Sequence, residues 1–272
     1  MLTIGFGTRQ VIEAMQEFAE RAYFVACLAF GRFLRAGRYS KVQIVSQAGE
    51  GQVRKYRSFY APLLVWLGDP LVRILDTGVF VLPQRDWVER ERTIYRSLRD
   101  RSIHIDADGT LVLPYLAGET LAALLENPRL DASVRKRAIE LAISALARFH
   151  RLGLTHGDAM AENVMVDLDA DVAHWFDFET IHDARRPLAW RRADDVRALL
   201  STCLVRTAPE ARADTLELIL DVYADESVTR LLATSFSTVL QRSLTFHLGQ
   251  ADLSLQDYRD IARLVQERHS AR

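Results

Sequence analysis

Three polar side chains in the middle of the chain have the types and the spacing that phosphoryl transfer requires. Asp158 is followed five positions later by Asn163, and Asp177 lies beyond the next apolar run. A carboxylate can orient the proton of an attacking hydroxyl, and carboxylate and amide oxygens are ligands that Mg²⁺ prefers. Any one of these residues alone would be typical of a turn or a helix cap. Together, with the strand-like segment 164–167 between them, they favour a phosphoryl-transfer site.

These motifs resemble the catalytic loop and the metal-binding aspartate of the protein-kinase-like superfamily. The form HGD-x4-N…DFE, which runs from His156 to Glu179, is more similar to lipopolysaccharide kinases of the Kdo/WaaP type and to other compact kinases (RIO, aminoglycoside/choline kinase-like) than to HRD…DFG protein kinases. The resemblance covers residues 40–205. It implies an α+β, bilobal protein-kinase-like fold, with a small antiparallel β lobe that carries helix C, a mainly helical large lobe and an extra N-terminal helix.

The resemblance implies a kinase that uses ATP and Mg²⁺ to phosphorylate a hydroxyl of a sugar, a lipopolysaccharide-type glycolipid or another small molecule. Asp158 would accept or orient the proton of that hydroxyl, and Asn163 and Asp177 would bind the metal ions that bridge the phosphates. His156 would support the loop by hydrogen bonds, and a role as general base is the weaker alternative. Gly157 replaces the arginine that protein kinases pair with an activation-loop phosphate, so control by loop phosphorylation is not expected.

Two other functions stay open. One is a compact atypical Ser/Thr protein kinase. The other is a nucleotide-binding pseudokinase that acts as a scaffold, because no G-x-G-x-x-G motif is present and Gly49 and Gly51 form a poor substitute. The segment between Asp177 and Asp194 is too short for the activation segment and peptide-docking loop of a regulated protein kinase. Glu179, where protein kinases have glycine, is either a further metal ligand or a hydrogen-bond acceptor.

A β-hairpin and a helix are predicted ahead of this trio. Segments 41–46 and 52–58 alternate in hydropathy around a glycine-containing turn, which is typical of a hairpin. By the resemblance, Lys55 in the second strand pairs with the nucleotide phosphates; an exposed strand lysine is the alternative. A helix over 84–98 places Glu91 on its apolar face, where an acid needs a cationic partner. Lys55 is the expected partner, and a surface network of Glu and Arg is the alternative.

The nucleotide base is expected at the end of the last small-lobe strand. Segment 111–118 follows a turn at Asp108-Gly109 and matches the position of the strand and hinge of a kinase. The resemblance implies that the C=O of Pro114 and the N–H of Leu116 face the adenine edge, with Leu113 as gatekeeper. Proline is acceptable at this position because only its carbonyl is needed.

The large lobe is predicted to centre on a long amphipathic helix from Asp131, its N-cap, to His150. Asp194 or Asp195 is expected to anchor the catalytic loop by accepting backbone N–H bonds. Three further helical patterns lie near 209–224, 227–248 and 254–268. Three scattered histidines are interpreted as ordinary polar positions: His104, His174 and His182.

The predicted domain division is 1–40 for an N-terminal helical extension, 41–116 for the small lobe and 117–272 for the large lobe. A helix is predicted over 9–36; it either packs on the small lobe or lies at a membrane interface, with packing favoured. The insert over 59–75 should form short helix and turn, and either covers the lobe or contacts a membrane.

Composition narrows the class of protein. The chain has 272 residues, 49% of them hydrophobic, and a formal net charge of -1, which argues against nucleic-acid binding driven by charge. Two cysteines, Cys27 and Cys203, lie in apolar helical contexts and are interpreted as buried free thiols. No signal peptide of the usual form and no spanning stretch of about 18 apolar residues is found. A cytoplasmic protein is expected, with peripheral contact at the inner face of the membrane left open.

Overall fold

The computed structural model describes residues 40–47, 50–57, 78–98, 103–107, 109–236 and 254–270, with isolated positions between 13 and 22. Most of the helix predicted over 9–36 and the whole insert over 59–75 therefore lie outside the described residues. Seven positions of the first segment are helical and exposed: Glu13, Met15, Glu17, Phe18, Ala19, Arg21 and Ala22. None of the described helices is long and apolar enough to cross a bilayer.

A four-stranded antiparallel sheet forms the smaller part of the molecule. Its order is β1-β2-β5-β4, with β1 at Ser40–Gln47, β2 at Glu50–Arg57, β4 at His104–Ile105 and β5 at Leu111–Pro114. The predicted hairpin is confirmed, and its strands are longer than expected: Gln47 pairs with Glu50, so only Ala48 and Gly49 connect β1 to β2. Two-residue connections are the commonest in β-hairpins.

Helix α3 (Gln84–Ser97) packs beside this sheet and confirms the predicted helix. Its apolar face repeats at helical spacing and is buried at Trp87, Glu91, Ile94 and Tyr95. A second ladder holds its N-terminal end, because β3 (Val79–Val81), which precedes the helix, pairs with β9 (Thr180–His182). The ladder joins α3 to the segment that follows Asp177, a pairing that the sequence pattern did not predict.

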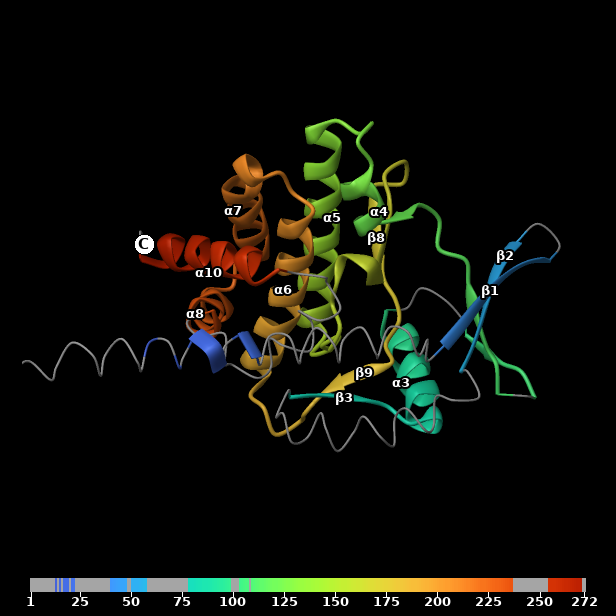
Figure 1. Ribbon diagram of the computed structural model, residues 1–272. Coiled ribbons are helices and arrows are strands. Elements are labelled where there is room, and N and C mark those ends of the chain that lie inside the picture. The colour runs from blue at the N-terminus through green and yellow to red at the C-terminus, as the bar shows by residue number, and fades with distance from the viewer. Residues whose placement is uncertain are drawn as a thin grey trace, which may run out of the picture.

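The larger part is mainly helical. It contains α4 (Leu121–Glu126), α5 (Ala132–Arg151), α6 (Leu188–Val205), α7 (Arg212–Tyr223), α8 (Glu226–Ser235) and α10 (Leu255–Ser270), with short 3-10 turns at Ala161–Asn163 and Pro209–Ala211. A small sheet of β6 (Glu119–Thr120), β7 (Val164–Asp167) and β8 (Val172–Trp175) lies against α5. Figure 1 shows β1, β2 and α3 on one side and helices α5, α6, α7, α8 and α10 on the other. This arrangement is the expected α+β, bilobal protein-kinase-like fold.

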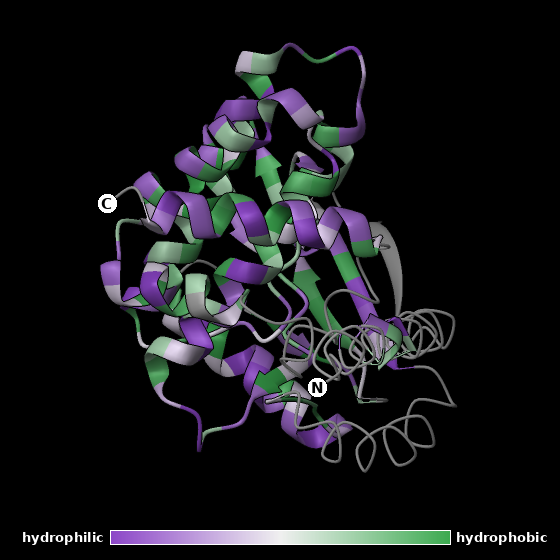
Figure 2. Ribbon diagram, turned by 60° about the vertical axis from the view of Figure 1, so that its left-hand side comes forward, coloured by the Kyte–Doolittle hydropathy of each residue, from purple (hydrophilic) through white to green (hydrophobic). Residues whose placement is uncertain are grey.

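Two helices form the centre of the large part. Helix α5 buries Ala138, Ala142 and Leu146 at a spacing of four, and α6 is buried along residues 193–204. The surrounding helices carry both hydrophilic and hydrophobic residues along their length (Figure 2), as expected of helices with one face on a core.

Some local expectations need correction. Asp131 occupies the N-cap position of α5, but its side chain makes no capping hydrogen bond. The pattern over 209–224 divides into a 3-10 turn and α7, which ends where Ala224 adopts a left-handed φ of 52°. Cys203 is a buried free thiol as expected, while Cys27 lies outside the described residues. The boundary expected at residue 116 falls between β5 and β6 and stays a prediction.

Candidate active site

Lys55 is a buried cation surrounded by carboxylates. Its side chain comes from β2 and is only 4% exposed, so the exposed-strand interpretation is wrong. Its Nζ lies 3.5 Å from Oε1 of Glu91, 2.5 Å from Oδ1 of Asp177 and 3.0 Å from Oε1 of Glu179. The expected contact with Glu91 is present, and Glu179, whose role the sequence left open, is an ion-pair partner of the same lysine.

Burial and charge act in opposite directions on this cluster. Burial by itself would lower the pKa of Lys55, but Asp177, Glu179 and Glu91 outweigh it and raise that pKa, so the ammonium stays charged. Burial raises the pKa of Glu91, and Lys55 opposes the rise. Glu91 also accepts hydrogen bonds from the Trp87 indole (3.1 Å) and from the backbone N–H of Phe178 (3.3 Å). The glutamate therefore fixes α3 to the segment that carries Asp177.

The aromatic ring of Phe178 connects that segment to the rest of the site. It packs edge-on against Tyr95 of α3 at 6.3 Å between ring centroids, and at 4.9 Å from the ring of His156. The preceding residue, Asp177, adopts a φ of 68°, which is uncommon for a residue with a side chain. Strained backbone of this kind persists where the surroundings determine it, and it often marks a functional position.

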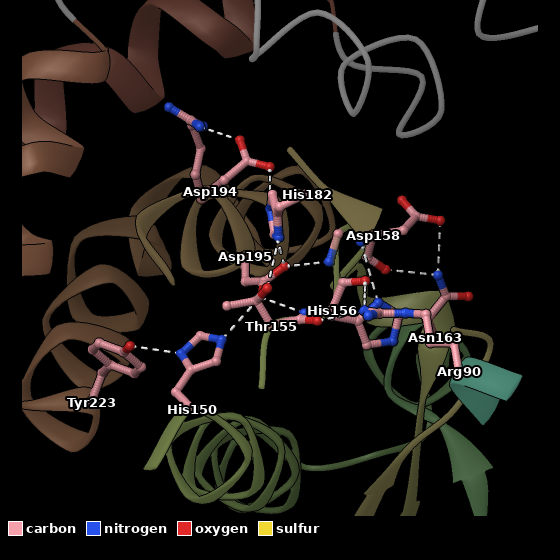
Figure 3. Close-up of polar contacts among 12 residues, drawn as sticks. Arg90, His150, Thr155, His156, Asp158, Asn163, His182, Asp194, Asp195 and Tyr223 are labelled. Carbon is pink, nitrogen blue, oxygen red and sulfur yellow. Dashed lines mark hydrogen bonds and ion pairs between the residues drawn. The ribbon is translucent and has the colours of Figure 1, made fainter. Parts of the chain in front are cut away.

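The loop that carries Asp158 is held by one buried aspartate of α6. Asp195 accepts hydrogen bonds from the backbone N–H groups of His156 (2.7 Å) and Gly157 (2.8 Å), so Asp195 and not Asp194 makes the expected anchor (Figure 3). Nε2 of His156 lies 2.9 Å from the carbonyl oxygen of Phe176, and its Nδ1 accepts from the N–H of Asp158 at 3.2 Å. Both ring nitrogens thus have backbone partners, as the supporting role of His156 requires.

Asn163 is hydrogen-bonded to Asp158 and to the backbone of Phe176, the residue before Asp177. Nδ2 of Asn163 donates to the carbonyl oxygen (2.8 Å) and to Oδ2 (3.0 Å) of Asp158, and the carbonyl of Asn163 accepts from the N–H of Phe176 (3.0 Å). This leaves the amide oxygen of Asn163 as a hard ligand. The side chain of Asp177 is 35% exposed and pairs with Lys55. The donor set therefore fits Mg²⁺ held jointly with phosphate oxygens.

A narrow cleft lies next to Lys55. Its volume is about 180 Å³, and it is lined by Val53, Lys55, Tyr95, Leu113, Pro114, Tyr115, Leu116, Met165, Phe176 and Asp177. The walls are mainly apolar and the charged residues among them are Lys55 and Asp177, so the cleft suits a flat, largely apolar group. The structure thus brings Leu113, Pro114 and Leu116 together with Lys55 and Asp177. Val53 and Met165, on the opposite lobes, were missed by the sequence analysis because apolar wall residues have no distinctive sequence signal.

The pairing of β2 with β5 orients the expected hinge carbonyl. The N–H of Tyr115 donates to the carbonyl of Gly51 at 3.0 Å, and bonded pairs alternate along an antiparallel ladder. Pro114, opposite Gln52, therefore belongs to a non-bonded pair, and its carbonyl faces away from β2. Gly51 itself lies under Tyr115, since a Cβ there would be 2.8 Å from the Tyr115 Cβ.

Two buried histidines, His150 and His182, support the loop that carries Asp158 through Asp195 and Thr155. His182 is buried between Oγ1 of Thr155 (3.0 Å) and Oδ2 of Asp194 (3.1 Å), so its interpretation as an ordinary polar position is wrong. His150 is likewise buried, between Oδ2 of Asp195 (2.9 Å) and the hydroxyl of Tyr223 (2.7 Å). The available sequence signal was the pair of adjacent aspartates in a helix rich in apolar residues, because each buried acid needs a donor.

Acidification is expected to destabilise the protein in two pH ranges. Burial lowers the pKa of His156 to about 4 from 6.5, so its contribution to stability is lost as pH falls from 6.5 to about 4. Burial would raise the pKa of Asp195, but His182 and His150 outweigh it and lower that pKa to about 2, so its contribution is lost between about 3.8 and 2. At 1.36 kcal/mol per pKa unit these losses are about 3 and about 2 kcal/mol.

Melting temperatures measured from pH 7 to pH 2.5 test this expectation. The variant His156→Gln cannot take up the proton, so its melting temperature should fall less than that of the wild type between pH 6.5 and 4. His104→Gln, at an exposed histidine, is the matched control and should follow the wild type. Equal slopes for His156→Gln and the wild type would contradict the assigned direction of the His156 pKa.

Comparison with known proteins gives a distant match to a kinase. No protein-family model matches the sequence. A mitogen-activated protein kinase kinase kinase of Pyricularia oryzae, MCK1, is 25% identical over 145 residues, which are 51% of this chain and 9% of that protein. The crystal structure of Rad53 1-466 in complex with AMP-PNP aligns with 84% of this chain and 57% of its own, at 15% identity and a TM-score of 0.33. The chain therefore spans less than two thirds of either relative, and its kinship to lipopolysaccharide kinases stays a prediction.

Proposed function

We propose that the chain is an ATP- and Mg²⁺-dependent phosphotransferase that acts on a hydroxyl of a sugar, a lipopolysaccharide-type glycolipid or another small molecule. The observation that carries the proposal is the arrangement of Lys55, paired with Glu91 and Asp177 at the mouth of an apolar cleft. The buried cation Lys55 matches the phosphate end of a nucleotide, and the apolar cleft beside it matches the base. The sequence match to a kinase supports the same class of reaction.

Each residue of the site has a role in this proposal. Lys55, oriented by Glu91, binds the nucleotide phosphates, and the backbone at Pro114 and Leu116 binds the adenine edge beside Leu113. Asn163 and Asp177 hold Mg²⁺, which when bound neutralises phosphate charge and aligns the transferred group. Asp158, held by the side chain of Asn163, orients the acceptor hydroxyl and takes up its proton. Catalysis of this type consists mainly of positioning and electrostatic stabilisation.

The segment after Asp177 supports a small acceptor over a peptide. Strand β9 ends at His182 and α6 begins at Leu188, so the chain enters the large-lobe core without a long activation segment. Gly157, with a φ of 88°, lies against β9: a Cβ there would be 3.1 Å from Oγ1 of Thr180. An arginine at 157 that could receive a loop phosphate is therefore sterically disfavoured. The compact Ser/Thr protein kinase remains the alternative acceptor class, and peripheral membrane contact stays a prediction.

A pseudokinase scaffold is the second candidate function. It is favoured by the sequence of the hairpin, which contains no G-x-G-x-x-G motif of the kind that covers the phosphates in kinases. The phosphotransferase and the pseudokinase scaffold differ in whether the bound nucleotide is turned over.

Nucleotide binding and turnover can be measured on the same protein. Mg·ATP at about 100 times its Kd should stabilise the native state by about 2.7 kcal/mol, and EDTA should remove the metal-dependent part of the rise in melting temperature. Incubation with ATP and a panel of glycan, glycolipid and small alcohol acceptors should transfer the γ-phosphate to a hydroxyl. Stabilisation without turnover on any acceptor would favour the scaffold. Serine or threonine autophosphorylation without transfer to these acceptors would favour the protein kinase.

A further inference from the structure

Arg90, the neighbour of Glu91 on α3, points to the catalytic loop and not to the nucleotide cleft. Its Nη2 donates to the carbonyl oxygens of Thr155 (2.6 Å) and His156 (3.2 Å) (Figure 3). Hydrogen bonds from a guanidinium are stronger than those between neutral groups. Consecutive residues of one helix thus contact different parts of the site: Glu91 holds Lys55 and Phe178, and Arg90 holds the loop.

The charge of Arg90 is maintained in spite of its burial. Burial lowers the pKa of this guanidinium to about 10, while the carboxylates of Asp195 and Glu91 oppose the shift. At neutral pH the side chain therefore remains a cation. Its two carbonyl contacts are made at a low local dielectric, where a charge-assisted hydrogen bond has its largest effect on geometry.

The peptide groups around His156 are held from both sides. Asp195, from the large lobe, accepts their N–H groups at His156 and Gly157, and Arg90, from the small lobe, donates to the carbonyls at Thr155 and His156. Asp158 follows immediately, so this double attachment determines the position of its carboxylate. No side chain fits at position 157 under β9, so residue 157 cannot itself supply a cation to this loop. Arg90 of α3 supplies that cation.

The position of α3 is itself fixed relative to the metal-binding segment. The β3–β9 ladder continues into a hydrogen bond from the N–H of Leu82 to the carbonyl of Glu179 at 2.9 Å. Arg90 therefore connects the part of the site that binds phosphate to the part that receives the acceptor hydroxyl.

We propose that Arg90 is a positioning residue for the transfer reaction, which sets Asp158 relative to the Lys55–Glu91 pair. The inference rests on the proposed kinase function. Arg90 itself has no role in the cleft and is absent from its lining, so nucleotide affinity should not depend on it.

The test compares Arg90→Met, which keeps most of the aliphatic stem, with Arg92→Met on the same helix. Arg92 is partly exposed and pairs with Glu89 at 3.2 Å, so its variant is the matched control. Displacement of Asp158 should lower kcat of Arg90→Met about 10²-fold, with KM and Kd for ATP unchanged. Arg92→Met should keep both constants. Arg90→Lys, which retains one donor to the loop, should recover part of kcat and serves as the test variant if Arg90→Met does not fold.

Amide hydrogen exchange provides a measure that does not depend on turnover. Loss of the contacts from Arg90 should make the amides of His156 and Gly157 exchange about tenfold faster in Arg90→Met, but not in Arg92→Met. An unchanged kcat, or a fall explained by lost ATP affinity, would overturn the positioning role, and so would unchanged exchange at both amides. If the wild type itself transfers no phosphate, the proposed function fails, and exchange alone decides whether Arg90 holds the loop.

Discussion

Asp158→Asn is expected to lower the rate of phosphate transfer about 10²- to 10⁴-fold and to leave the affinity for Mg·ATP unchanged. The substitution is nearly isosteric, and the backbone carbonyl of residue 158 can still accept from Nδ2 of Asn163. What is lost is a carboxylate that can accept the proton of the acceptor hydroxyl. Because Asp158 does not line the nucleotide cleft, binding and transfer should separate in this variant.

The measurement is steady-state transfer from ATP together with thermal stabilisation by Mg·ATP. Asp169→Asn is a suitable control. Asp169 lies exposed in the turn between β7 and β8, and its substitution removes the same charge. Turnover of Asp158→Asn equal to that of the control would contradict the assigned role of Asp158. A parallel loss of ATP stabilisation would show that the residue serves nucleotide binding instead.

Lys55→Met is expected to abolish nucleotide binding and to destabilise the fold by about 3–5 kcal/mol, the usual cost of removing one partner of a buried ion pair. The variant leaves Glu91, which is fully buried, beside Asp177 and Glu179 without their shared cation. Lys136→Met, at an exposed lysine of α5, is the control and should have little effect on either property.

The destabilisation by Lys55→Met should depend on pH with a definite sign. The pKa of Glu91 is raised in the folded protein by burial, and loss of Lys55 removes the contribution that opposes this rise. The folded state then binds more protons than the unfolded state above the ordinary value of 4.5, so stability falls as pH rises. Urea unfolding at pH 5 and pH 8 should show a larger loss at pH 8. An equal loss at both values would contradict the buried-carboxylate explanation.

Local patterns allowed much of the site to be predicted. The need of Glu91 for a cationic partner followed from one acid on an apolar helical face, and the resemblance to kinases indicated Lys55 as that partner. Backbone positions such as Pro114 were found only through the resemblance, because a hydrogen bond from the main chain does not constrain the side chain. The choice between Asp194 and Asp195 could not be made, since α6 is buried on all sides and its pattern does not orient it.

Contacts between distant segments were not predictable. Arg90 binds carbonyl oxygens, which every residue has, so the sequence carries no signal for its partners at positions 155 and 156. His182 was misinterpreted because its burial depends on a three-residue strand that pairs with another three-residue strand far away in the sequence. Strands this short are stabilised by tertiary contacts and not by their own propensity.

The central claim is that the cleft beside Lys55 binds Mg·ATP for transfer to a hydroxyl bound near Asp158. A structure of the protein with Mg²⁺ and AMP-PNP tests this claim most directly. We expect the base to lie against Val53, Met165 and the Pro114 carbonyl, with Nζ of Lys55 on a phosphate oxygen. Asn163 and Asp177 should share the metal, and the terminal phosphate should face Asp158. A nucleotide bound elsewhere, or a metal that contacts neither Asn163 nor Asp177, would contradict it.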